Sequence, residues 1–103
     1  MTTTRKPKSA KPSLRPVLVT TAHRGVFYGY ATDTNGETIK LTSARNCLYW
    51  SRECGGFMGL AANGPVGDSR VGAKADIEIR NITSVTEVAP GAAKVWDEKA
   101  TWK

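Results

Sequence analysis

The sequence has only one histidine, His23, and only two cysteines, Cys47 and Cys54. A Ser-His-Asp or Cys-His catalytic arrangement would have to use His23, and no motif supplies a positioned nucleophile and an orienting group. A Cys47-His23 pair is the enzymatic alternative that remains. Structural zinc sites usually show close ligand pairs, which these cysteines do not form. We therefore expect no enzyme, no catalytic residue, no metal, no cofactor and no disulfide.

Long apolar runs and paired acids are also missing. A membrane-spanning helix needs about 20 consecutive apolar residues, and no such stretch exists here. Residues 1–14 are basic, but no apolar segment follows them as a signal peptide would require. The Asp and Glu residues are scattered, so no pair is marked as general acid and base. We expect a cytoplasmic protein without a membrane partner.

Acidic residues are absent from the start of the chain, where residues 1–15 hold five Lys or Arg. Residues 16–103 hold ten basic and nine acidic residues, so the formal charge of +6 is concentrated in this first stretch. Few of its side chains are apolar, and burial cannot offset the entropy of ordering them. We predict a disordered basic arm over residues 1–15 and a single small β domain over residues 16–103. Such an arm can contact phosphates, or it can act as a solubilising tail or lie on a partner subunit.

From residue 16 onward the pattern is typical of β-strands. Residues 15–21 are rich in β-branched side chains, and residues 25–31 are rich in aromatic ones. The Asn-Gly pair at 35–36 readily supplies the positive φ of a tight turn. Apolar and polar residues then alternate, as they do in a strand with one buried face. The predicted strands cover residues 15–21, 25–31, 37–42, 44–51, 75–81 and 82–88.

A glycine-rich segment over residues 52–74 interrupts this pattern. Phe57, Met58 and Leu60 in this segment would be costly to leave in water. We expect an ordered excursion that packs on the sheet or on another subunit. Further on, Pro90 and the apolar residues after it indicate a short C-terminal helix within residues 89–99, because proline is tolerated in the first turn of a helix.

Together these elements predict a mainly β fold. It is a small bent antiparallel sheet or a partly open barrel, with the glycine-rich excursion and the short C-terminal helix added to it. The first strands resemble those of an Sm-like or SH3-like barrel, in which a glycine-bearing second strand bends. Gly25 and Gly29 would be the bending points here.

The stretch HRGVFYGY at residues 23–30 is followed by Ala44, Arg45, Cys47, Tyr49 and Trp50 in an ARxCxYW arrangement, and then by the glycine-rich segment. This combination resembles a family of short proteins of bacteriophages and prophages, over most of residues 16–96. The resemblance brings no established catalytic residue. It implies a protein that acts in the cytoplasm of an infected bacterium, where small β proteins bind nucleic acids, signalling nucleotides or components of host defence.

Tyrosines and arginines supply the candidate binding site. Aromatic faces stack on nucleobases and arginines pair with phosphate, a combination worth roughly 1–3 kcal/mol per stacked base. The alternative is ordinary cross-strand packing of the tyrosines, solvated arginines and a purely structural glycine-rich loop. Candidate ligand-binding residues, at strand ends, on strand faces and in the glycine-rich segment, are Arg24, Tyr28, Tyr30, Arg45, Tyr49, Arg52, Ser69 and Arg70.

The predicted function is that of a non-enzymatic, phage-type binding protein that captures a nucleic acid or a small nucleotide signal and thereby counters host defence. So short a domain has a thin core, and it offers apolar surface to share at Phe57, Met58 and Leu60 and at Trp96 and Trp102. We therefore expect a homo-oligomer. The alternative is a protein-binding inhibitor of a host system, or a virion accessory component. It would dock on a host defence or phage protein through Phe57, Met58 and Leu60.

Overall fold

We describe a computed structural model of the chain, which covers residues 14–22 and 25–102. Six strands form one antiparallel sheet in the order β4-β3-β2-β1-β6, with β5 paired to β3. The sheet is not closed, so the predicted mainly β fold with a bent, partly open sheet and a short C-terminal helix is confirmed. The elements are β1 (Arg15–Thr21), β2 (Val26–Ala31), β3 (Thr38–Tyr49), η2 (Arg52–Cys54), α1 (Gly56–Ala62), β4 (Arg70–Val71), β5 (Ala75–Arg80), β6 (Ile82–Glu87) and α2 (Pro90–Glu98).

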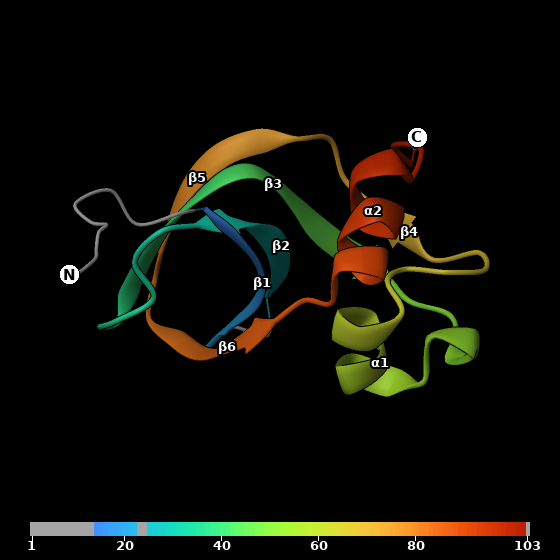
Figure 1. Cartoon of the computed structure of the whole chain (residues 1–103), viewed down its shortest axis with the longest axis horizontal. Helices are drawn as coiled ribbons and strands as arrows, with labels where there is room; N and C mark the ends of the chain where they lie inside the picture. Colours follow the sequence, from blue (N-terminus) through green and yellow to red (C-terminus); the bar gives the residue numbers. More distant parts are fainter. Residues whose placement is uncertain (1–13, 23–24, 103) are drawn as a thin grey trace, which may run out of the picture.

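The elements are arranged in two lobes (Figure 1). Strands β1, β2, β3, β5 and β6 curve around one another and form the barrel lobe. Elements η2, α1, β4 and α2 form the helical lobe beside it. A single residue, Asn81 with φ of 60°, separates β5 from β6 and lets the chain turn from one to the other. In the range that the structure describes, no helix is long and apolar enough to cross a membrane.

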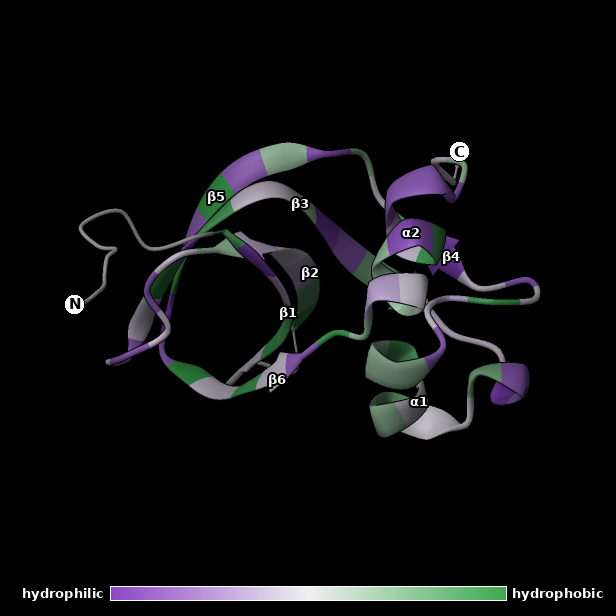
Figure 2. Cartoon of the chain, viewed as in Figure 1, coloured by the Kyte–Doolittle hydropathy of each residue, from purple (hydrophilic) through white to green (hydrophobic). Residues whose placement is uncertain are grey.

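Strand β1 is buried on both faces because the two lobes have separate apolar cores. Val17 and Val19 belong to a core formed by the barrel strands, whereas Leu18 between them belongs to a core under the helices. This division follows from the alternation of side chains along a strand. Hydrophobic residues accordingly recur along the strands and fill much of α1 (Figure 2).

One long strand, β3, stands where two short strands were predicted. Ser43 was expected to separate them, but it only bends the strand. Ser43 adopts φ of 53°, and its N–H donates to Asp76 Oδ1 on β5 at 3.0 Å. The first part of β3 pairs with β5 and the later part with β2, so this bend carries the sheet around the barrel lobe.

Gly29 lies where the register between β2 and β3 shifts. A Cβ atom at this position would approach Leu41 Cβ to 2.9 Å and Ala44 Cβ to 3.2 Å. We expect Gly29→Ala to lower the free energy of unfolding by about 1–3 kcal/mol, because the added methyl overpacks the barrel core. Urea unfolding measures the change. Gly91→Ala in α2 is the matched control, since a Cβ there meets nothing within 4 Å; equal behaviour of the two variants would contradict the close approach.

The glycine-rich segment is ordered and packs against the rest of the chain, as predicted. It forms η2, α1 and β4. Leu60 is fully buried in the core under the helices, Phe57 packs partly against that core, and Met58 is 67% exposed. The three apolar residues thus have different environments, and Leu60 is not accessible to a partner. Trp96 is also fully buried, so the expectation that it offers apolar surface to a second subunit was wrong.

Candidate functional site

The structure separates the predicted ligand-binding residues by exposure. Tyr28, Arg45 and Ser69 are buried and Tyr30 is half-buried, whereas Tyr49, Arg52 and Arg70 are exposed. Arg24 lies outside the described residues, as does His23 of the alternative Cys-His pair. Tyr28 and Arg45 were predicted to bind a ligand, but neither is accessible to one, because α2 covers this part of the sheet.

The two strand tyrosines fasten α2 to β2. The Tyr28 ring stacks on the Trp96 ring with centroids 4.9 Å apart and planes inclined by 4°. The Tyr28 and Tyr30 hydroxyls donate to the two carboxylate oxygens of Asp97, at 3.0 Å and 2.6 Å. Burial, with these hydrogen bonds, raises the pKa of both tyrosines, so the hydroxyls remain protonated donors at neutral pH. Their polar groups are therefore engaged inside the protein.

Arg45 binds the end of α2 and the segment that follows it. Its Nη1 donates to the carbonyl oxygens of Trp96 at 2.8 Å and Lys99 at 2.5 Å. Its Nε donates to the Gly72 carbonyl at 2.7 Å, and its Nη2 to Thr101 Oγ1 at 3.2 Å. The last carbonyls of a helix have no partner within the helix, and Arg45 supplies one. Arg45 is thus a structural clamp between β3, β4 and the C-terminal residues.

Ser69 is likewise occupied within the chain. Its hydroxyl accepts the Ser51 N–H at 3.0 Å and donates to the Val66 carbonyl at 2.6 Å. Cys54 Sγ lies 3.2 Å from the same hydroxyl. The glycine-rich segment therefore does not present Ser69 to a phosphate.

Three extended segments meet at the edge of the helical lobe. Tyr49 at the end of β3 is the Cα partner of Arg70 in β4. On the other side of β4, Val71 forms a parallel bridge with Thr101, and the Trp102 N–H donates to the Val71 carbonyl at 3.0 Å. β4 is therefore the middle segment. Its Val71 side chain is buried, and the Arg70 side chain points to the opposite, exposed face.

Tyr49, Arg70 and Trp102 form what we call the aromatic platform. The Arg70 Cζ atom lies 5.5 Å from the Tyr49 ring centroid and 5.4 Å from the Trp102 ring centroid. Tyr49 is 46% and Trp102 52% exposed, so about half of each side chain reaches solvent. Both contacts have the geometry of cation–π interactions. The platform combines two accessible aromatic rings with a cation between them.

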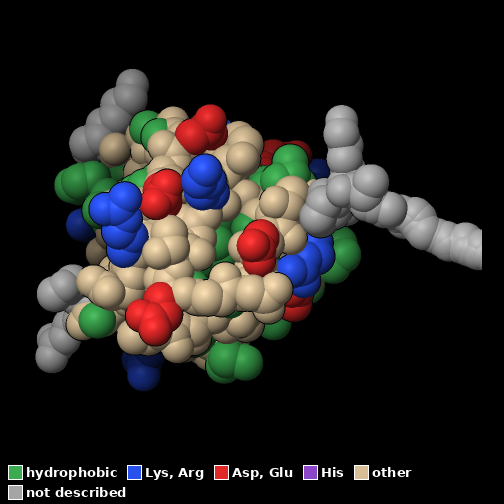
Figure 3. Space-filling model, turned by 90° about the vertical axis from the view of Figure 1, so that its left-hand side faces the viewer, with side chains coloured by type: hydrophobic (Ala, Val, Ile, Leu, Met, Phe, Trp, Pro, Cys, Tyr) green, Lys and Arg blue, Asp and Glu red, His purple; other side chains and the backbone are tan. Residues whose placement is uncertain are grey.

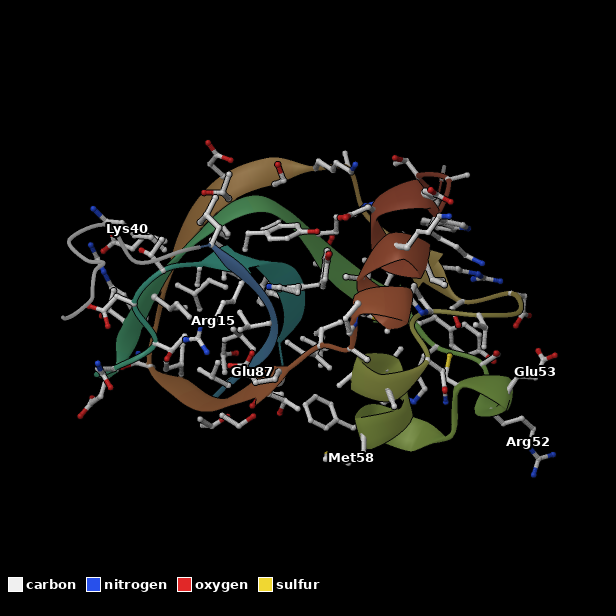
Figure 4. All side chains as sticks on the ribbon, in the orientation of Figure 1. Arg15, Lys40, Arg52, Glu53, Met58 and Glu87 are labelled. Carbon is white, nitrogen blue, oxygen red and sulfur yellow. The ribbon has the colours of Figure 1, made fainter. Side chains whose placement is uncertain are left out.

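No carboxylate neutralises this cation within the part of the chain that the structure describes. Two ion pairs are formed there, Arg15 with Glu87 and Arg80 with Glu78, and Arg70 belongs to neither. On the face of the barrel lobe shown in Figure 3, acidic and basic side chains are intermixed. Arg52 projects from the far end of the helical lobe beside Glu53 (Figure 4). The platform is therefore better suited to a stacked anionic ligand than either of these places.

Sequence reasoning identified Tyr49 and Arg70 of this site but not Trp102 as a binding residue. Asp97 was only one of the scattered acids of the sequence, whereas in the structure it accepts hydrogen bonds from both strand tyrosines. The aromatic side chain of Trp102 was a usable signal in the sequence. Arg70, which contacts this ring in the structure, lies far from it along the chain. The described residues contain no group of three His, Cys, Asp or Glu side chains that could hold a metal ion.

Both cysteines are free thiols. Cys54 is fully buried, and burial raises the pKa of the half-buried Cys47 thiol to about 11. A thiol reacts through its thiolate, so this shift opposes nucleophilic use of Cys47 at neutral pH.

We expect iodoacetamide to modify Cys47 about 100-fold more slowly in the folded protein than in urea at pH 7, because its thiolate fraction is lower. The rate should keep rising with pH up to about 11. Peptide mass spectrometry separates Cys47 from Cys54 and measures both. Equal rates in folded and unfolded protein at neutral pH would contradict the raised pKa.

Comparison with known proteins relates this sequence to a family. The family model DUF6948, a domain of unknown function, matches residues 14–96. This range contains Tyr49 and Arg70, whereas Trp102 lies beyond it. No curated protein and no solved structure matches the chain. Since the match covers well over half of the sequence, the chain belongs to the DUF6948 family of domains of unknown function.

Proposed function

We propose that this chain is a non-enzymatic binding protein that captures a nucleic acid or a nucleotide on the aromatic platform. The observation that carries the proposal is the Arg70 guanidinium, placed between two half-exposed aromatic rings without a carboxylate partner among the described residues. Ring faces stack on nucleobases, and a guanidinium pairs with phosphate. The formal charge of +6 would add a general attraction for such anions.

The resemblance to bacteriophage and prophage proteins supplies a setting for this proposal. In the cytoplasm of an infected bacterium, a protein that captures a nucleic acid or nucleotide signal withholds it from host defence. A homo-oligomer would present several platforms at once. Partly exposed apolar side chains such as Leu48 and Met58 support a shared surface between subunits.

The proposal is tested first on the protein purified from bacterial cells. We expect an excess of absorbance at nucleic-acid wavelengths, which is lost after denaturation or a high-salt wash together with a released ligand. Mass spectrometry of that ligand separates an oligonucleotide from a small nucleotide. Arg70→Gln should lower the amount retained, whereas Lys40→Gln, which removes an exposed charge from the barrel lobe, should not (Figure 4). Retention that is equal in both variants would count against the platform.

A second candidate function rests on a different surface. A hollow of about 460 Å³ lies between α1 and the chain around the start of α2, and it is lined by Met58, Ala61, Ala62, Thr86, Glu87, Val88, Ala89 and Pro90. Met58 is 67% exposed, which supports docking on a protein, as an inhibitor of a host system or a virion component would do. If this is the function, Met58→Asp abolishes capture of the partner protein, while Arg70→Gln leaves it unchanged.

A further inference from the structure

Building on the proposed function, on which this step depends, we infer that the platform binds an unpaired nucleic-acid strand. Neighbouring bases of that strand would stack on Tyr49 and on Trp102, and the phosphate that joins them would lie at Arg70.

The order of groups on the platform matches the chemical repeat of a strand. Arg70 stands on β4, with Tyr49 on the neighbouring β3 and Trp102 on the segment paired to the other edge. Both ring centroids lie within 5.5 Å of the same guanidinium carbon. Successive nucleotides offer base, phosphate and base, and the platform offers ring, cation and ring. A single nucleotide has only one base and would use one of the two rings.

The openness of the platform also favours a strand over an isolated nucleotide. Sites for small ligands are concave and bury about 70–90% of the ligand surface. Tyr49 and Trp102 are about half exposed, so the described residues do not enclose these two rings. The Ser69 hydroxyl does not complete a phosphate pocket, because it is hydrogen-bonded to Val66 and Ser51. A strand can instead gain affinity by adding contacts along its length.

A duplex does not present the surface that these rings require. Base faces inside a duplex are covered by neighbouring bases, and proteins read a duplex through groove edges. Unpaired bases leave their faces free to stack on aromatic side chains.

The test uses the full chain and fluorescence anisotropy with a labelled oligothymidylate of about 12 nucleotides. Thymidine monophosphate, the matched duplex and an abasic strand of equal length serve as competitors. We expect each of these competitors to bind at least 10-fold more weakly than the unpaired strand. Tyr49→Ala and Trp102→Ala should each weaken strand binding roughly 5- to 150-fold, which corresponds to the loss of one stacked base. Ile77→Ala, at an exposed apolar residue of β5 in the barrel lobe, is the matched control and should leave affinity unchanged.

Conservative variants separate stacking from folding. Tyr49→Phe and Trp102→Phe keep an aromatic face, so they should retain most of the affinity that the alanine variants lose. Arg70→Gln should lower the salt dependence by about 0.7 in the slope of log K against log salt concentration, the value for one phosphate contact on a single strand. Lys40→Gln should leave that slope unchanged. Circular dichroism checks that each variant is folded.

Three outcomes would overturn the inference in distinguishable ways. If thymidine monophosphate binds as tightly as the strand, and the platform variants weaken its binding, the proposed function stands but the inferred preference for a strand is wrong. If the folded protein binds neither, the proposed function fails as well. If the strand binds, but the two alanine variants bind it as tightly as the unchanged protein does, the platform is not the site.

Discussion

Arg45→Ala is expected to lower the free energy of unfolding by about 2–4 kcal/mol and to weaken ligand binding at the platform, although Arg45 is buried and reaches no ligand. The loss of stability follows from the acceptors that the guanidinium serves. Carbonyl groups of Trp96, Lys99 and Gly72 would lose a charged donor in a part of the chain with little access to water. Urea unfolding measures this loss.

The loss of binding follows from the position of Trp102. Arg45 holds Thr101, and Thr101 bridges to Val71 beside Arg70, so the clamp keeps Trp102 against β4. Arg45→Lys retains the charge but has a single donor atom in place of the planar fork, so we expect a partial loss of both properties. The residue acts through Trp102 and is a positioning residue.

A double-mutant cycle distinguishes positioning from a general loss of structure. In the background of Trp102→Ala, Arg45→Lys should cost little further affinity for the oligothymidylate, because the ring that it positions is already gone. The same change should still lower stability in that background. Additive losses of affinity would show that Arg45 does not act through Trp102. An unchanged affinity of Arg45→Lys alone would make it a purely structural residue.

The strands were predictable because their signal is local. Side-chain patterns along the chain mark β1, β2, β5 and β6 to within a residue or two. The continuity of β3 through Ser43 was not predictable in this way, since the bend depends on a hydrogen bond to Asp76, which lies far along the chain. The glycine-rich segment was correctly expected to be ordered, but its helix α1 has no clear periodic pattern.

The site was only partly predictable, for the same reason. Tyr28 and Tyr30 do share a face, as expected, but α2 covers that face, and a strand pattern alone does not say what packs on it. Arg45 was selected for its charge, yet its charge is used to hold carbonyl groups. Tyr49 and Arg70 meet Trp102 only because the end of the chain returns to β4.

The position of α2 therefore decides which aromatic residues are available, and Trp96 holds that position. Trp96 is fully buried, stacks on Tyr28, and donates from Nε1 to the Leu60 carbonyl of α1 at 3.0 Å. One side chain thus joins α2 to β2 and to α1. We expect Trp96→Ala to lower the free energy of unfolding by about 3–5 kcal/mol, because it leaves a large cavity at this junction.

Such a loss is a large part of the stability of a small domain, about 5–15 kcal/mol, so a milder variant is needed beside it. Trp96→Phe keeps an aromatic ring against Tyr28 but removes the indole N–H that the Leu60 carbonyl accepts beside the Gly64 N–H, and we expect a loss of about 1–3 kcal/mol. Both variants should also expose more of Tyr28, and Trp96→Ala should do so more than Trp96→Phe. The Tyr28 hydroxyl should then ionise at lower pH in an ultraviolet titration, because burial is the main cause of its raised pKa. If Trp96→Phe left both the stability and this titration unchanged, α2 would be held by Asp97 and Arg45 alone.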